Sequence, residues 1–105
     1  MYWVLVASAL VVPPGGDAII NAAMADVARR FAMKARVVEV ERVTWRDGSL
    51  GCPQKGMGYT QALVPGWRVV LAAGSREFLY HSSETGPPFA CPPGRAKKPL
   101  PGPAT

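Results

Sequence analysis

The sequence has little of the chemistry that metal centres require. Its 105 residues include one histidine, His81, and two cysteines, Cys52 and Cys91. Neither cysteine belongs to a CxxC or CxxH arrangement, whereas a tetrahedral zinc site needs about four nitrogen or sulfur ligands. Met57 and His81 with a thiolate would make a soft, copper-like set, but one methionine and one histidine are too few. We therefore expect no metal and no cofactor.

The residue types of a hydrolase are present, but their spacing is not. His81 stands next to Ser82 and Ser83, and Asp47 could complete a triad. The sequence contains no GxSxG nucleophile elbow. A single histidine at the end of a strand is usually a hydrogen-bonded or solvated side chain with no catalytic role. We expect a protein that is not an enzyme, and a small hydrolase that uses His81 is kept as one alternative.

Acidic residues are scarce, with 7 Asp and Glu against 12 Lys and Arg, and the net charge is +5. Arg95, Lys97 and Lys98 supply part of this excess, so residues 1–94 carry a net charge of only +2. A nucleic-acid-binding protein concentrates its basic residues on a folded face. We therefore predict no nucleic-acid partner and interpret residues 92–105 as a disordered, Pro-rich basic tail.

A hydrophobic run long enough to cross a membrane is also missing. The amino-terminal run Tyr2–Val12 has eleven residues interrupted only by Ser8, about half of what a transmembrane helix needs. That length is typical of the hydrophobic region of a secretion signal, although no Lys or Arg precedes it. We predict that residues 1–16 are a degenerate or truncated signal-like segment, with no stable membrane span. The alternative is a first β-strand that pairs with the sheet.

Hydrophobic periodicity predicts one helix followed by strands. Asp17 is expected to be the N-cap of a helix that fades near residues 33–34 and carries an apolar stripe of Ile20, Met24, Val27 and Phe31. Residues 37 and 38 are adjacent valines, which is typical of a bulge. Antiparallel strands are predicted over 35–45, 59–64, 67–71, 77–81 and 89–91.

The fold class is therefore α+β. Residues 17–91 are expected to form a single domain, with one N-terminal helix packed on a small antiparallel sheet of three to four strands. We expect the core at the interface of the helix and the sheet to be built largely from Trp45, Trp67, Phe78 and Tyr80. The two cysteines are either free thiols or one disulfide, and an oxidising compartment favours the disulfide.

Residues 43–71, VTWRDGSLGCPQKGMGYTQALVPGWRVVL, followed by FLYHSSETGPPFAC at residues 78–91, form a distinctive pattern. It resembles a family of small exported bacterial proteins of unknown function that carry W-x-D-x-S-L-G-C-P-x-x-G-M-x-Y-x-Q-x-x-x-x-G-[YW]-[RK]-[IV], then a Y-H pair and a final cysteine. The matching positions here are Trp45, Asp47, Ser49, Leu50, Gly51, Cys52, Pro53, Gly56, Met57, Tyr59, Gln61, Gly66, Trp67, Arg68, Tyr80, His81 and Cys91. The resemblance covers roughly residues 18–91. It implies export and one disulfide, Cys52–Cys91, and it assigns no activity.

The loop in this pattern is the candidate binding segment, formed by Pro53, Gln54, Lys55, Gly56, Met57 and Tyr59. One interpretation is a protease-inhibitor-like module in which residues 51–57 present Lys55 to a trypsin-like enzyme, because a pre-ordered loop loses less entropy on binding. The simpler interpretation is a constrained connection, with Met57 packing the loop onto the sheet.

We expect a monomeric, non-enzymatic binding or envelope-associated module with an unknown protein or envelope partner. It would be extracellular or in the cell envelope. A cytoplasmic location would follow if the amino-terminal run were a strand and the cysteines were reduced.

Overall fold

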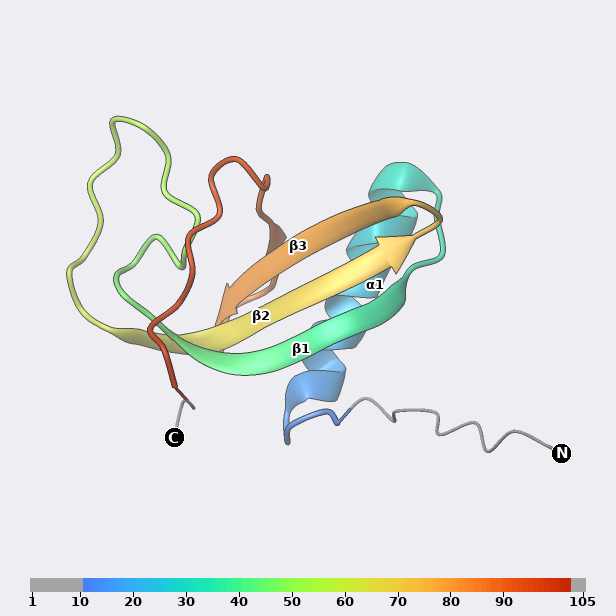
Figure 1. Cartoon of the computed structure of the whole chain (residues 1–105), viewed down its shortest axis with the longest axis horizontal. Coiled ribbons are helices and arrows are strands. Elements are labelled where there is room, and N and C mark those ends of the chain that lie inside the picture. Colours follow the sequence, from blue (N-terminus) through green and yellow to red (C-terminus); the bar gives the residue numbers. More distant parts are fainter. Residues whose placement is uncertain (1–10, 103–105) are drawn as a thin grey trace, which may run out of the picture.

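The computed structural model describes residues 11–102, which contain one helix and four strands. In chain order these are α1 (Gly16–Phe31), β1 (Arg36–Trp45), β2 (Val64–Ala73), β3 (Arg76–Ser83) and β4 (Phe89–Ala90). Each strand pairs antiparallel with the next, and α1 lies across one face of the sheet (Figure 1). The predicted α+β fold is confirmed. Most of the signal-like segment or first strand expected at residues 1–16 lies outside the described residues.

The ends of α1 are set by two residues in the left-handed region. Gly15 is the N-cap with φ of 90° and makes no side-chain cap, so Asp17, the expected N-cap, lies in the first turn instead. Its carboxylate is still favourable there because the amino end of a helix carries partial positive charge. At the other end Ala32 has φ of 53°, and its N–H donates to the Ala28 carbonyl at 3.0 Å. The helix therefore ends at Phe31, slightly earlier than expected.

The main core lies between α1 and one face of the sheet. Ile20, Ala23 and Val27 of the helix are buried against side chains from the three long strands: Val40, Trp67, Val69, Leu71, Phe78 and Tyr80. The expected bulge is present, because the register of β1 against β2 shifts between Val37 and Glu39. The alternation of side chains along a strand then decides which residues reach the helix.

Trp45 corrects the sequence-based expectation. It is fully buried, but it is not part of the cluster that packs against α1. Its ring instead lies 4.4 Å from the ring of His81, and its Nε1–H donates to the Ser82 carbonyl at 2.9 Å. Trp45 therefore belongs to a second cluster on the opposite face of the sheet.

Two irregular segments lie over the end of that opposite face that holds Trp45 and His81 (Figure 1). The first, residues 46–63 between β1 and β2, is here called the cysteine loop, and the second, residues 92–102, is called the tail. The N–H of Lys97 donates to the Gly51 carbonyl at 2.8 Å, and the N–H of Leu100 donates to the Thr44 carbonyl at 3.0 Å. The tail was expected to be disordered, but through residue 102 it packs across the sheet because these carbonyls supply partners for its backbone.

The strand predicted at residues 59–64 is not formed, and β2 begins only at Val64. Within the cysteine loop the N–H of Gly48 donates to the Thr60 carbonyl at 2.8 Å, which closes the loop near its base. Asp47 and Gly48 form the expected turn, where the Asp47 carboxylate accepts the Ser49 N–H at 2.8 Å. Residues 59–63 pair with no other strand, and a strand needs such a partner to form.

A buried polar contact joins the helix to the sheet. Tyr80 is fully buried, and its hydroxyl donates to the Asp26 carboxylate at 2.6 Å. The same carboxylate accepts from Arg29 and forms an ion pair with Arg30 at 3.3 Å. Burial and the Asp26 carboxylate raise the pKa of Tyr80, so the phenol remains protonated and serves as a donor. The contact satisfies two groups that would otherwise be costly to bury.

Tyr80→Phe is expected to lower the free energy of unfolding by about 1–3 kcal/mol, because the buried Asp26 carboxylate loses a donor. Urea unfolding at pH 7 measures the change. Tyr59→Phe is the matched control, since the Tyr59 hydroxyl accepts only the exposed N–H of Gln54. Equal losses in the two variants would contradict the assigned role of the buried contact.

Candidate functional site

The candidate binding residues lie on the cysteine loop, at the end of the sheet away from the connection between α1 and β1 (Figure 1). The loop has a buried base, which includes Ser49, Gly51 and Cys52, and an exposed tip formed by residues 54–58. The base and the tip have different physical roles, so they are described separately.

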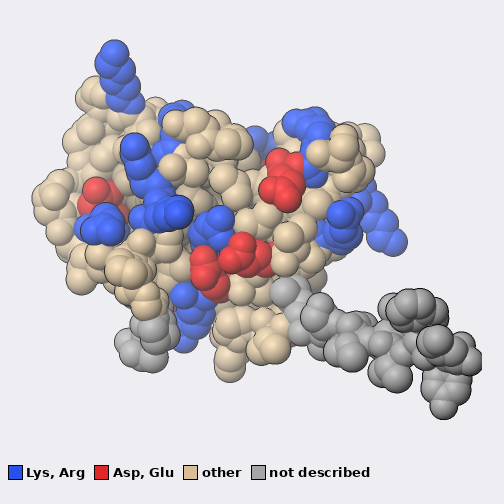
Figure 2. All heavy atoms as spheres, viewed as in Figure 1, with Lys and Arg blue, Asp and Glu red and all other residues tan. Residues whose placement is uncertain are grey.

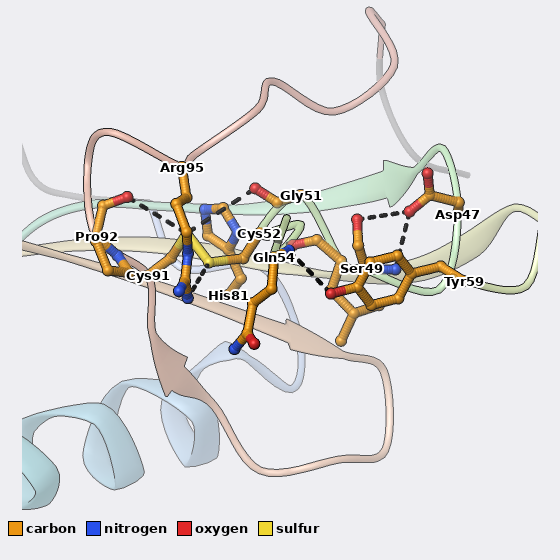
Figure 3. The surroundings of a disulfide bond; sticks show 11 residues. Asp47, Ser49, Gly51, Cys52, Gln54, Tyr59, His81, Cys91, Pro92 and Arg95 are labelled. Atoms are coloured by element: carbon orange, nitrogen blue, oxygen red, sulfur yellow. Dashed lines mark hydrogen bonds between the residues drawn. A yellow bond between two sulfur atoms is a disulfide. The ribbon is translucent and has the colours of Figure 1, made fainter. Parts of the chain in front are cut away.

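The Cys52–Cys91 disulfide ties the base of the loop to the residue that follows β4 (Figure 3). Its two Cα atoms are 5.9 Å apart and its cysteines are 39 residues apart in the sequence. In the chain-entropy model, a crosslink closing a segment of this size stabilises the folded state by roughly 4 kcal/mol. Both cysteines are buried, and the disulfide implied by the family resemblance is confirmed.

Leu50 and Gly51 turn the chain sharply just before the disulfide, with φ of 55° and 73°. A side chain at Gly51 would collide with the Trp45 ring, so glycine is required both for its conformation and for its size. The Gly51 carbonyl accepts the N–H of Lys97. The close approach of loop, tryptophan and tail therefore depends on this one position.

His81 forms a hydrogen bond with the turn at Leu50 and Gly51. Only 1% of its surface is exposed, and its Nδ1 lies 2.7 Å from the Leu50 carbonyl, which makes Nδ1–H the donor. The ring also packs against Trp45 and meets Phe89 edge-on at 6.3 Å. Burial lowers the pKa of His81 below its ordinary value of 6.5. Two weaker effects oppose each other, because the hydrogen bond to the Leu50 carbonyl raises this pKa and the charge of Arg68 lowers it. The histidine is thus a structural side chain of the loop base.

The tip of the loop is a tight turn. The N–H of Met57 donates to the Gln54 carbonyl at 3.1 Å, and Gly56 has φ of 84°. A positive φ at the third position of such a turn is the signature of a type II turn, which places Lys55 at the second position. The Tyr59 hydroxyl accepts the N–H of Gln54 at 2.9 Å and braces the tip from inside the loop.

The structure separates the six predicted loop residues into two groups. Pro53 and Tyr59 are half-buried, while the other four project into solvent: Gln54, Lys55, Gly56 and Met57. The interpretation of Met57 as a plug against the sheet is wrong, because 60% of its surface is exposed. The turn at Gln54–Met57 lifts the methionine away from the sheet face that it would have to cover.

The tail brings basic residues close to the cysteine loop. The composition of residues 92–105 predicts that these basic residues lie in an unpacked segment. Arg95 lies over the disulfide, where its guanidinium donates to Cys52 Sγ at 3.5 Å (Figure 3). Arg46, Lys97 and Lys98 surround a hollow of about 90 Å³ beside the loop base. Asp47 also lines it; hydrogen bonds from Ser49 lower the pKa of its carboxyl. The position of Cys91 is the sequence feature that could have indicated the contact between the tail and the loop. A disulfide at Cys91 fixes where the tail starts.

Within residues 11–102 no group of three or more His, Cys, Asp or Glu side chains is arranged to hold a metal ion. None of the helices in this range has the length and apolar character needed to cross a membrane. The candidate site in the described residues is therefore the surface formed by the cysteine loop and the tail.

Folding stability is expected to fall as the pH is lowered from about 7.5 to 5.5, by up to about 1.4 kcal/mol per pH unit. The pKa of His81 is lower in the folded than in the unfolded chain, so below pH 6.5 the unfolded state binds the proton more readily. His81→Asn removes the titrating ring while keeping an N–H near the Leu50 carbonyl. Urea unfolding across this range should show a flatter pH dependence for the variant, and an unchanged slope would contradict the assignment.

Replacing both cysteines, by Cys52→Ser with Cys91→Ser, is expected to lower the free energy of unfolding by about 4 kcal/mol. The same change should accelerate trypsin cleavage after Lys55, because the loop base is no longer tied to β4. Cleavage after Lys34, which lies outside the closed segment, provides the internal reference in a timed digest read by mass spectrometry. A loss of stability without faster relative cleavage at Lys55 would mean that the disulfide does not hold the loop.

The model of one protein family matches residues 20–91, which is more than half of the chain. The match extends from within α1 to Cys91, so it includes both cysteines and the whole cysteine loop. No curated protein and no solved structure matches the chain significantly. The chain belongs to the family described as a domain of unknown function, DUF8738.

Proposed function

We propose that this domain is an exported, non-enzymatic protein-binding module whose interface is the exposed part of the cysteine loop. The observation that carries the proposal is the exposure of two large apolar side chains, Met57 at 60% and Leu63 at 61%, on a loop whose base is buried and crosslinked. Methionine is adaptable in shape and is common at binding surfaces. A partner that covered both side chains would remove apolar area from water.

Preorganisation supports the same surface. The disulfide, the hydrogen bond from His81 to Leu50 and the turn at Gln54–Met57 all restrict the loop before any partner arrives. A loop that is already ordered loses less conformational entropy on binding, and the saving adds to affinity.

Export is supported by the disulfide, because such bonds persist in oxidising compartments and are rare in the cytosol. The absence of catalysis is supported by the position of His81. The ring is buried and its Nδ1 is occupied by the Leu50 carbonyl, while the Asp47 carboxylate is occupied by Ser49. A general base needs access to the proton it abstracts, and neither group offers it here.

A protease-inhibitor-like module is the second candidate, because Lys55 is exposed close to the disulfide. Its backbone shape argues the other way. Peptide recognition in a protease cleft requires an extended segment that can pair with the enzyme. Lys55 lies instead inside a hydrogen-bonded turn, beside Gly56 with φ of 84°. Stoichiometric inhibition of trypsin by the intact protein would favour this candidate over the binding module.

The test is capture of partners from the medium and envelope fraction of the native culture by the immobilised full chain. Met57→Asp and Leu63→Asp should each lose a partner that the unchanged protein retains, because a charge replaces apolar contact area. Val38→Asp is the matched control, since Val38 is 44% exposed on the β1 bulge, away from the loop. Retention of every partner by both loop variants, with unchanged melting temperatures, would contradict the proposal.

A further inference from the structure

The charge of the chain is unevenly distributed over its surface. The cysteine loop and the tail through residue 102, together the loop end, carry five basic residues, Arg46, Lys55, Arg95, Lys97 and Lys98, and one acidic residue, Asp47. All the other residues together hold 7 basic and 6 acidic side chains. Figure 2 shows Lys and Arg side chains gathered over the loop end, and again at the far end of the molecule. Most of the net charge of +5 therefore comes from the loop end.

These cations are held in place by the backbone. The disulfide fixes the start of the tail, and the hydrogen bonds from Lys97 to Gly51 and from Leu100 to Thr44 fix its course. Arg46 consequently lines the same hollow as Lys97 and Lys98, although about 50 residues separate it from the two lysines in the sequence. A fixed arrangement of charges can match a partner's charges, which a mobile tail cannot do without losing entropy.

The basic side chains of the loop end form no ion pair within residues 11–102. Within residues 11–102, the ion pairs use Arg29, Arg30, Arg42 and Arg68, and none of them involves the loop end. Arg46, Lys55, Lys97 and Lys98 are exposed. The hydrogen bonds from Ser49 lower the pKa of Asp47, so its carboxylate stays charged and cancels one of the five positive charges. Three net positive charges are left on exposed residues, because Arg95 is half-buried over the disulfide.

The exposed apolar side chains of the cysteine loop indicate the class of partner. Met57 and Leu63 are exposed on the same loop as Lys55, so the surface offers apolar contact as well as charge. A nucleic-acid surface would add exposed aromatic rings for base stacking. Trp45 and Trp67 are buried, and the Tyr59 hydroxyl braces the tip. We propose that the loop end binds an acidic protein segment that carries carboxylates beside an apolar side chain.

This inference rests on the proposed function, because it names the partner class of the same surface. The probe is a fluorescein-labelled synthetic peptide rich in Glu and containing Leu, titrated with the full chain and followed by fluorescence anisotropy. Lys97→Glu with Lys98→Glu should weaken binding about tenfold, since two attractive contacts become repulsive. Added salt should weaken binding by the unchanged protein more than binding by the variant.

The matched control is Lys34→Glu with Arg36→Glu. Both residues are exposed and basic, they lie at the far end of the molecule, and the substitutions change the net charge by the same amount. Binding of the peptide by this variant should stay within about twofold of the unchanged protein if the loop end is the site. Equal weakening in the two double variants would overturn the inference, because total charge alone would then explain binding.

Two further arms separate the partner classes. Vesicles containing anionic phosphatidylglycerol and a single-stranded oligonucleotide are titrated under the same conditions. Tighter binding of either one than of the peptide, lost in the Lys97 and Lys98 variant, would overturn the assignment to a protein segment.

If the peptide does not bind while Met57→Asp and Leu63→Asp still abolish capture, the acidic partner is excluded and the protein-binding function stands. If the peptide binds but capture is unaffected, the capture-based function fails separately.

Discussion

The Cys52–Cys91 disulfide is the constraint on which the loop end depends. It joins the loop between β1 and β2 to the segment that leaves β4, two parts of the chain with no regular secondary structure. Irregular segments have few backbone partners of their own, so a crosslink that reduces the freedom of the unfolded chain is an effective way to order them. The crosslink holds the start of the tail close to the loop, where backbone N–H groups of the tail donate to the Gly51 and Thr44 carbonyls.

Two neighbouring residues of β3 connect the sheet to both of its covering layers. The side chain of Tyr80 points to the helix side and meets Asp26, while His81 points to the opposite side and meets Leu50. Strand geometry makes this possible because successive side chains alternate between the faces. The Y-H pair is therefore a structural device, with one polar contact for α1 and one for the cysteine loop. Neither residue is exposed.

The fold followed well from local patterns. The stripe of Ile20 and Val27 predicted the helix, and alternation around Trp67 and Phe78 predicted the hairpin that forms the centre of the sheet. The errors arose where local patterns carry no information about partners. Residues 59–63 lie between two turn signals like a short strand but pair with no other strand, and Trp45 is as apolar as Trp67 but lies on the other face. Which face a residue occupies depends on the register of pairing, and the bulge near Val37 shifts that register.

For the candidate site, the sequence by itself determined that a Gly- and Pro-rich segment with Cys52 had to form an irregular loop, because those residues do not sustain helix or strand. It also determined the shortage of catalytic and metal-binding groups. Only the tertiary structure decided that Met57 projects into solvent and that Lys97 and Lys98 join Arg46 on one surface. The physical reason is that a loop's exposure and a surface's charge depend on contacts between segments far apart in the chain, which no local pattern records.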